Sequence, residues 1–270
     1  MKADKIISII EKQAPLKLQE EWDNSGWQIK AKNDLKKVLV ALEIRSDIID
    51  EATEKGCDLI VTHHPMAFKD ELGEVNDNIV TAKHRERLSK AGISVYSSHT
   101  PFDKCDLGNN DYLGMILGFD CFAPIGCIDR DKAYDGPEEA LEYVRIGFYD
   151  EALTLEQFMD RASCELGIDR KFIRYAGDTN VIISKACWCT GSGSEFMESA
   201  LVDDCDLFIT GDLKYHDAQK AHELGINILD LGHWGTEKIF TRAMKAVLRE
   251  LKKEGLIIIE SELDLNPFAF

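Results

Sequence analysis

The sequence lacks long hydrophobic runs. Its longest unbroken apolar runs are about five residues, as at 38–42, whereas a membrane-spanning helix needs about 20. The first 15 residues carry charges on both sides of a short apolar stretch and contain no small-residue cleavage site. That pattern is typical of an amphipathic helix and not of a signal peptide. We therefore expect no membrane association and a cytoplasmic location.

Positive charge is also scarce. Lys and Arg number 32 against 49 Asp and Glu, which gives a formal net charge of −17. Such a surface repels phosphate backbones and anionic lipids, so the charge argues against non-specific nucleic-acid binding and membrane docking. A local basic patch can still bind a small anionic substrate, and Lys69 and Lys214 are the candidates.

The composition excludes several classes of protein. Hydrophobic residues make up 44% and charged residues 30% of the chain, which is typical of globular proteins and excludes disorder, collagen or coiled coil as the main state. A length of 270 residues indicates one large or two modest domains.

Cysteine chemistry is also limited. The eight cysteines include no CxxC pair, and in a cytoplasmic protein we expect them to be reduced. Cys187 and Cys189 flank Trp188 and would lie on one face of a strand. They are either a weak metal motif or, as we favour, small apolar side chains packed in a core.

Short β-rich runs alternate with helical stretches. The first half predicts strands and helices in alternation over 38–43, 47–55, 58–62, 79–91, 93–97 and 110–117. The second half predicts the same alternation over 181–190, 195–202, 207–210, 215–224 and 226–231, followed by a long helix over 236–253. A capping box at Thr154 predicts a further helix to about residue 166. The alternation predicts an α/β fold with mainly parallel sheets.

The two halves of the chain look related. Segments 38–62 and 186–210 align at a constant offset of 148 residues, which matches Cys57 with Cys205. Any two strand–helix–strand units share some such features by chance, but we favour an internal duplication. We therefore expect two similar α/β lobes related by a pseudo-twofold axis.

The lobe boundary is predicted from a polar loop at 129–139, which divides the chain into lobes 1–128 and 129–270. The first lobe carries the motifs HHP and HTPFD. The second lobe carries TGDLKYH and GHWGTE.

Four of the seven histidines closely follow predicted strands: His63, His64, His99 and His233. In open parallel α/β sheets, ligands bind outside the carboxyl ends of the strands, so we expect these imidazoles to face one crevice. Two neighbouring imidazoles beyond a strand can splay and bind different metal ions. The alternative is a pair of loop histidines bonded to backbone carbonyl groups.

Two of these histidines are followed by a carboxylate four residues later. Asp103 follows His99, and Glu237 follows His233. Together with His63 and His64, they supply enough nitrogen and oxygen ligands for two cations, which two-metal sites hold about 3.5–4 Å apart. Glu237 is the candidate bridging ligand. Because the set has no thiolate, Zn, Fe, Mn, Co and Ni all suit it.

Two loops of the second half have open roles. Asp212 and His216 follow the strand at 207–210, and by the repeat offset Asp212 occupies the position of His64. Either side chain can serve a substrate or support a metal ligand. The loop 191–194 presents backbone N–H groups to a phosphate, or it is a tight turn closed by a serine cap.

These motifs, in this order, resemble the Nif-three-like family, also known as the GTP cyclohydrolase I type 2 family of YbgI-like dinuclear metal proteins. The resemblance rests on the blocks EWDNSG (21–26), DLIVTHHP (58–65), SHTPFD (98–103), ITGDLKYH (209–216) and GHWGTE (232–237). Departures from the family pattern lie at Glu43, where aspartate is usual, at Pro101, and in the polar 190–194 loop.

The resemblance implies a dinuclear metal site at the interface of two lobes, with two divalent ions per chain, in a toroidal homohexamer. Carried over by motif, the metal ligands are His63, His64, Asp103, His233 and Glu237. The family pattern places Asp103 and His64 on one ion, His63 and His233 on the other, and Glu237 between them. His99 then lies beside the site as a catalytic or substrate-binding group.

The implied function is that of a metal-dependent hydrolase acting on a small molecule, with a nucleotide as one candidate substrate. GTP ring opening and phosphoester hydrolysis both suit such a site. The alternative is a non-enzymatic metal-binding assembly or regulatory protein. An open coordination position distinguishes the two, because catalytic sites keep one and structural sites are closed.

Overall fold

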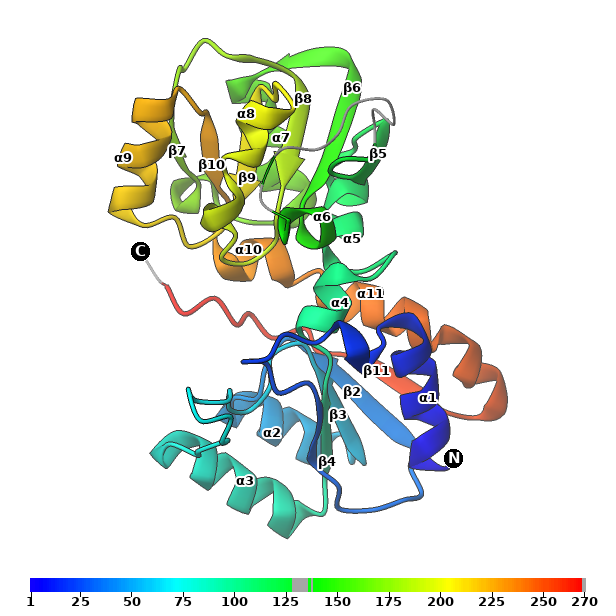
Figure 1. Ribbon diagram of the computed structural model, residues 1–270. Coiled ribbons are helices and arrows are strands. Elements are labelled where there is room, and N and C mark those ends of the chain that lie inside the picture. The colour runs from blue at the N-terminus through cyan, green and yellow to red at the C-terminus, as the bar shows by residue number, and fades with distance from the viewer. Residues whose placement is uncertain (128–135, 137, 269–270) are drawn as a thin grey trace. The chain divides into compact units, whose positions relative to one another are not determined.

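The structure is a computed structural model that describes residues 1–127, 136 and 138–268. It confirms the predicted α/β class, with two sheets that are each covered by helices (Figure 1). The chain forms two compact units. Unit 1 contains Met1–Gly108 and Phe240–Leu265, and unit 2 contains Asn109–Ile239 and the C-terminal residues from Asn266.

The division falls after Gly108 instead of at the expected 128/129 boundary, which lies outside the described residues together with most of the 129–139 loop. Helix α5 (Asn109–Leu117) belongs to unit 2 because Leu113 and Leu117 are part of its core. The chain also returns to unit 1 at its end, where strand β11 pairs with β2. Neither contact is visible in a local sequence pattern.

Unit 1 is a three-layer arrangement around a five-stranded sheet of order β1-β4-β3-β2-β11. All pairings in this sheet are parallel except that of β1 with β4. This sheet is therefore mainly parallel, as expected. In Figure 1, α1 and α11 cover one face and α2 and α3 the other. The elements are α1 (Ala3–Gln13), β1 (Gly26–Ile29), β2 (Lys37–Ala41), α2 (Ser46–Glu54), β3 (Leu59–Thr62), α3 (Ile79–Ala91), β4 (Ser94–Ser97), α4 (Thr100–Lys104), α11 (Phe240–Val247) and β11 (Ile257–Glu260).

Unit 2 is built on a six-stranded sheet of order β5-β6-β8-β9-β10-β7. Here the expectation of a mainly parallel sheet is wrong: only β8–β9 and β9–β10 pair in parallel among the described residues. The further elements are β5 (Cys121–Pro124), α6 (Ala140–Tyr143), β6 (Arg145–Thr154), α7 (Leu155–Leu166), β7 (Arg174–Ala176), β8 (Ile182–Trp188), α8 (Ser199–Val202), β9 (Leu207–Thr210), α9 (Tyr215–Leu224), β10 (Ile228–Asp230) and α10 (His233–Glu237).

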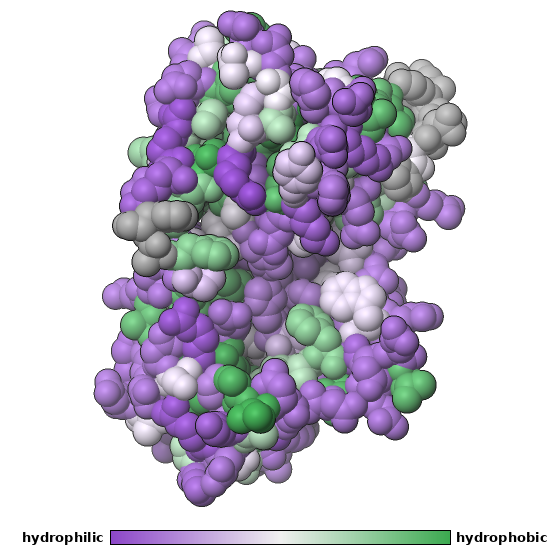
Figure 2. All heavy atoms as spheres, turned by 90° about the vertical axis from the view of Figure 1, so that its left-hand side faces the viewer, coloured by the Kyte–Doolittle hydropathy of each residue, from purple (hydrophilic) through white to green (hydrophobic). Residues whose placement is uncertain are grey.

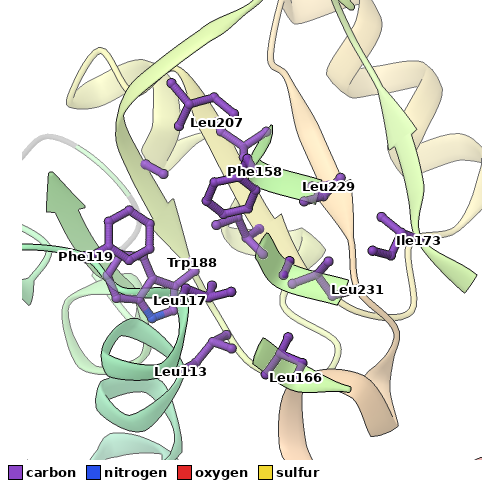
Figure 3. Close-up of a cluster of buried hydrophobic side chains, with 14 of the residues drawn as sticks. Leu113, Leu117, Phe119, Phe158, Leu166, Ile173, Trp188, Leu207, Leu229 and Leu231 are labelled. Atoms are coloured by element: carbon purple, nitrogen blue, oxygen red, sulfur yellow. The ribbon is translucent and has the colours of Figure 1, made fainter. Parts of the chain in front are cut away.

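The core of unit 2 follows from the alternation of side chains along β8. Trp188 points to the face covered by α5 and α7, where Figure 3 shows it beside Phe119 and Leu117. Cys187 and Cys189 point to the opposite face and pack with Phe208 in a second hydrophobic cluster. The two cysteines are therefore core residues, as the favoured interpretation predicts.

The internal repeat appears in the strand registers of the two units. In unit 1, Val38 pairs with Leu59 across β2 and β3. In unit 2, Ala186 pairs with Leu207 across β8 and β9, which is the same register 148 residues later. The carboxylates of Asp58 and Asp206 each accept hydrogen bonds from two successive backbone N–H groups at equivalent positions. These shared details support the predicted duplication.

Helix ends are confirmed in part. Thr154 forms the predicted capping box with Gln157 at the start of α7. The long helix expected over 236–253 is instead α10, α11 and a 3-10 helix over Leu248–Glu254. Ser46 is the first residue of α2, and Arg45 is its N-cap residue.

None of the helices in the described part of the chain is long and apolar enough to span a membrane. Figure 2 shows one face of the molecule, where hydrophilic residues predominate and hydrophobic residues form separate patches. This hydrophilic face agrees with a composition in which 30% of the residues are charged.

Candidate metal centre

Unit 1 gathers three histidines at the carboxyl ends of two neighbouring parallel strands. Thr62 at the end of β3 pairs with Ser97 at the end of β4. His63, His64 and His99 therefore emerge at one edge of the sheet. Each offers a ring nitrogen, and these three nitrogens lie within 4.8 Å of one another. The ring centroid of His63 is 5.1 Å from that of His64 and 4.9 Å from that of His99.

Asp103 joins this cluster from helix α4, one turn after His99. Its carboxylate oxygen Oδ1 lies 3.5 Å from Nε2 of His63. His63 is fully buried and Asp103 is nearly so. The structure thus brings together all four site residues that the sequence predicts in unit 1.

Each imidazole of the cluster has a partner on Nδ1. His63 Nδ1 donates to the backbone carbonyl of Ser98 at 3.0 Å. His99 Nδ1 faces Asp23 Oδ1 at 3.1 Å, and His64 Nδ1 faces Glu43 Oε2 at 3.4 Å. Ionised carboxylates and carbonyl groups only accept hydrogen bonds, so each Nδ1 carries a proton and Nε2 is the nitrogen that could bind a metal ion.

Asp23 is the main residue that the sequence interpretation missed. It is fully buried and accepts hydrogen bonds from the hydroxyl groups of Ser25 and Thr100, each at 2.7 Å. Burial alone would raise the pKa of the Asp23 carboxyl, but His99 and these hydroxyl groups lower it from 3.8 to about 2. Asp23 is therefore ionised and holds His99 in one orientation. The EWDNSG block was the available signal.

Unit 2 holds the second group. His233 and Glu237 lie one turn apart on α10, with His233 Nε2 2.9 Å from Glu237 Oε2. Asp212 Oδ2 lies 2.7 Å from His233 Nδ1. Burial alone would lower the pKa of the His233 imidazole, but the carboxylates of Glu237 and Asp212 raise it to about 11. The negative potential that attracts a proton here equally attracts a metal cation.

The backbone explains why these residues lie so close together. Asp212 has a φ of 53°, in the left-handed region that aspartate tolerates better than most residues. A side chain on the preceding Gly211 would come within 2.6 Å of the backbone nitrogen of His233. Gly211 is therefore required for the close approach that places Asp212 against His233.

The Gly191–Gly193 loop is a tight turn and not a phosphate cradle. The N–H groups of Gly191 and Gly193 donate to the hydroxyl groups of Thr236 and Thr210, each at 2.9 Å. A Cβ atom on Gly191 would lie 2.2 Å from Glu237 Oε1. The loop thus packs against the Glu237 carboxylate and leaves no room for a side chain.

His216, the other candidate of the 211–216 loop, lies outside these groups. His216 is exposed on α9, where its ring packs against Tyr215. Within the described residues, the clusters that combine three potential metal-binding side chains contain no cysteine.

The donor chemistry fits divalent transition metals. The imidazoles present Nε2 nitrogens, two buried carboxylates lie beside them, and the Nδ1 atoms are held by carboxylates and a carbonyl, as is usual for metal-binding histidines. No thiolate takes part. The residues that fit a metal are His63, His64, His99 and Asp103 in unit 1, and His233 and Glu237 in unit 2.

Comparison with known proteins agrees with the motifs. The model of the Duf34/NIF3 (NGG1p interacting factor 3) family matches residues 1–267. The chain belongs to the DUF34/NIF3 family. A Clostridium perfringens member named GTP cyclohydrolase 1 type 2 homolog is 35% identical over all of both chains.

Solved structures of DUF34/NIF3-like proteins share the fold. The Staphylococcus aureus protein SA1388 superposes with a TM-score of 0.86 at 25% identity, over 100% of this chain and 99% of that one. The protein ybgI, described as of unknown function, superposes with a TM-score of 0.83 at 23% identity, over 99% and 100%. The family resemblance predicted from five sequence blocks is thereby confirmed.

Proposed function

We propose that this DUF34/NIF3 protein is a hydrolase that depends on two divalent metal ions and acts on a small anionic substrate. One observation carries the proposal: the imidazoles of His63, His64, His99 and His233 all have Nδ1 engaged. Nε2 is then the proposed ligand atom of His63, His64 and His233, and the proposed proton-accepting atom of His99. Three of these Nδ1 atoms contact carboxylates and that of His63 contacts a backbone carbonyl, as is usual for metal-binding histidines.

The proposed ligand set draws on both units: His63, His64, Asp103, His233 and Glu237. His99 is not needed as a ligand in this set. When bound, a pair of divalent ions lowers the pKa of a water and polarises the bond to be hydrolysed. Metal identity is left open among Zn, Fe, Mn, Co and Ni.

His99 is the proposed proton-transfer residue. Its Nε2 accepts a proton while Asp23, on Nδ1, stabilises the resulting imidazolium, as the carboxylate does in a Ser-His-Asp triad. Asp23 is a positioning residue because it acts through His99. The two together hold and release a proton at a fixed place beside His63 and His64.

Two reactions suit these parts. GTP ring opening adds water at C8 of the guanine ring, and phosphoester hydrolysis adds water at phosphorus. The name of the C. perfringens relative favours the first. We further propose, from the family resemblance, that the protein works in the cytoplasm as a toroidal homohexamer.

The test is an assay of metal-loaded protein with GTP and with p-nitrophenyl phosphate. We expect turnover of at least one substrate. The variant His99→Gln should retain its metal, measured by elemental analysis, and lose roughly 100-fold or more in rate, the usual contribution of a general acid or base. A fully metal-loaded protein that hydrolyses neither substrate would support the non-enzymatic alternative.

A further inference from the structure

Two large aromatic side chains lie exposed beside His99. Trp22 is 50% exposed and Phe68 is 46% exposed. The ring centroids of Trp22 and Phe68 lie 5.6 Å and 5.4 Å from that of His99, and 5.8 Å from each other. All three residues belong to unit 1. The rings therefore border the histidine cluster while keeping much of their surface open to solvent.

The loops that carry these rings are fixed to each other. The backbone N–H of Lys69 donates to the carbonyl of Trp22 at 3.2 Å. Asn24 Nδ2 donates to the carbonyl of Ala67 at 3.0 Å. Trp22 also directly precedes Asp23, which is fully buried. The two rings are therefore held in place before any ligand arrives, which lowers the entropic cost of binding.

The geometry of the rings indicates what they bind. The planes of Trp22 and Phe68 are inclined by 51°, and the plane of His99 is nearly perpendicular to that of Trp22. They form a corner whose aromatic faces are not stacked on each other. Such faces bind planar rings by stacking and by edge-to-face contact, with little dependence on the identity of the base.

A lysine near the two rings indicates a ligand that carries negative charge. Lys69 follows Phe68, and its Nζ lies 3.3 Å from the carbonyl of Glu21, next to Trp22. Its ammonium group can pair with a phosphate group on a ligand whose ring packs against Trp22 and Phe68. It favours a ring that carries a phosphate group.

We propose that Trp22 and Phe68 form a subsite for a planar heteroaromatic base of a substrate that also carries phosphate. This inference rests on the proposed function, because the base would lie beside the histidines that act on it. Trp22 and Phe68 would then determine which substrates bind, and the metal ligands would determine what happens to them.

The experiment compares two probes that share a phosphate and differ in the base. Guanosine 5′-monophosphate and ribose 5-phosphate are titrated into metal-loaded and metal-free protein by calorimetry. We expect the nucleotide to bind at least about tenfold more tightly, and Trp22→Leu or Phe68→Leu to reduce this preference at least about fivefold, the loss of one stacked ring. Trp22→Phe should restore part of the preference. Metal content should be unchanged in all of them.

Phe268→Leu is the matched control, because Phe268 is an exposed aromatic residue of unit 2. This variant should keep the preference for the nucleotide. If Trp22→Leu and Phe68→Leu keep the preference for the nucleotide over ribose 5-phosphate, the subsite is overturned. A smaller native mass in these variants would also overturn it, because the rings would then belong to a contact with a second copy of the chain. Absence of bound metal from the wild type would instead overturn the proposed function. It would leave the subsite open to test, because the preference for the nucleotide is also measured in metal-free protein.

Discussion

Asp212 holds the imidazole of His233 by a 2.7 Å contact between Oδ2 and Nδ1. The contact depends on a left-handed backbone at Asp212 and on the lack of a side chain at Gly211. In unit 1, Asp23 contacts Nδ1 of His99 in the same way at 3.1 Å. Each half of the proposed site thus has a carboxylate that orients a histidine without being a proposed metal ligand.

The first prediction follows from Asp212. Asp212→Asn removes the charge that orients His233 but keeps a residue that tolerates positive φ. We expect divalent metal to bind roughly 10–100-fold more weakly, the usual effect of losing such a partner. Competition with a fluorescent chelator measures this affinity. Asp204→Asn is the control, because Asp204 is an exposed aspartate of unit 2 with a φ of 49°; equal losses in both variants would contradict the assigned role.

The second prediction concerns stability and pH. The pKa of Asp23 is about 2 in the folded protein against an ordinary value of 3.8. A depressed pKa contributes stability above the unfolded value, and this stability is lost as the pH falls from about 4 towards 2. Asp23→Asn should therefore lower the free energy of unfolding of metal-free protein by about 2 kcal/mol at pH 7 and flatten its decline in acid.

Urea unfolding at a series of pH values checks this second prediction. The control Glu54→Gln changes an exposed carboxylate of the same unit. A variant Asp23→Asn that declines in acid as steeply as the parent would show that Asp23 is not the group responsible.

Much of the fold could be predicted because buried strands are short apolar runs. Strands β3 and β9 lie within a residue of their expected bounds, and helices α3 and α9 match theirs. The missed strands include β1, β5 and β7, which pair antiparallel at the edges of their sheets. Edge strands are partly exposed, so their sequences lack the continuous apolar character of buried parallel strands.

The proposed metal ligands could be predicted for a related reason. His63 and His64 directly follow a strand, and the other three lie on short helices that begin within a few residues of a strand end. Pairs of histidine and carboxylate at such places can be noticed in sequence. Asp23 and Glu43 could not be assigned, because their contacts with His99 and His64 bring together residues 76 and 21 positions apart. The lobe boundary was missed for the same reason, since tertiary packing assigns α5 to unit 2.

The third prediction concerns substrate charge. Lys69 and Lys214 were singled out as cations that guide an anion to the site. Replacing both by Met should weaken binding of guanosine 5′-monophosphate by roughly threefold or more and reduce its dependence on salt. The control replaces two other exposed lysines, Lys83 and Lys252, by Met. Equal affinity and salt dependence in both double variants would exclude this role.

The fourth prediction concerns assembly. The family resemblance implies a native mass several times the chain mass of 30.4 kDa, that of a hexamer. Size-exclusion chromatography with light scattering measures it directly. A monomer at micromolar concentration would contradict the proposed assembly without affecting the metal ligands.

The central claim is that one chain binds two metal ions through His63, His64, Asp103, His233 and Glu237. Elemental analysis of metal-saturated, dialysed protein tests it most directly. The account predicts about two divalent ions per chain in the wild type, loss of most of both in Glu237→Ala, and no loss in Glu223→Ala, which changes an exposed glutamate of α9. Less than about half an ion per chain in the wild type, or full metal content in Glu237→Ala, would contradict it.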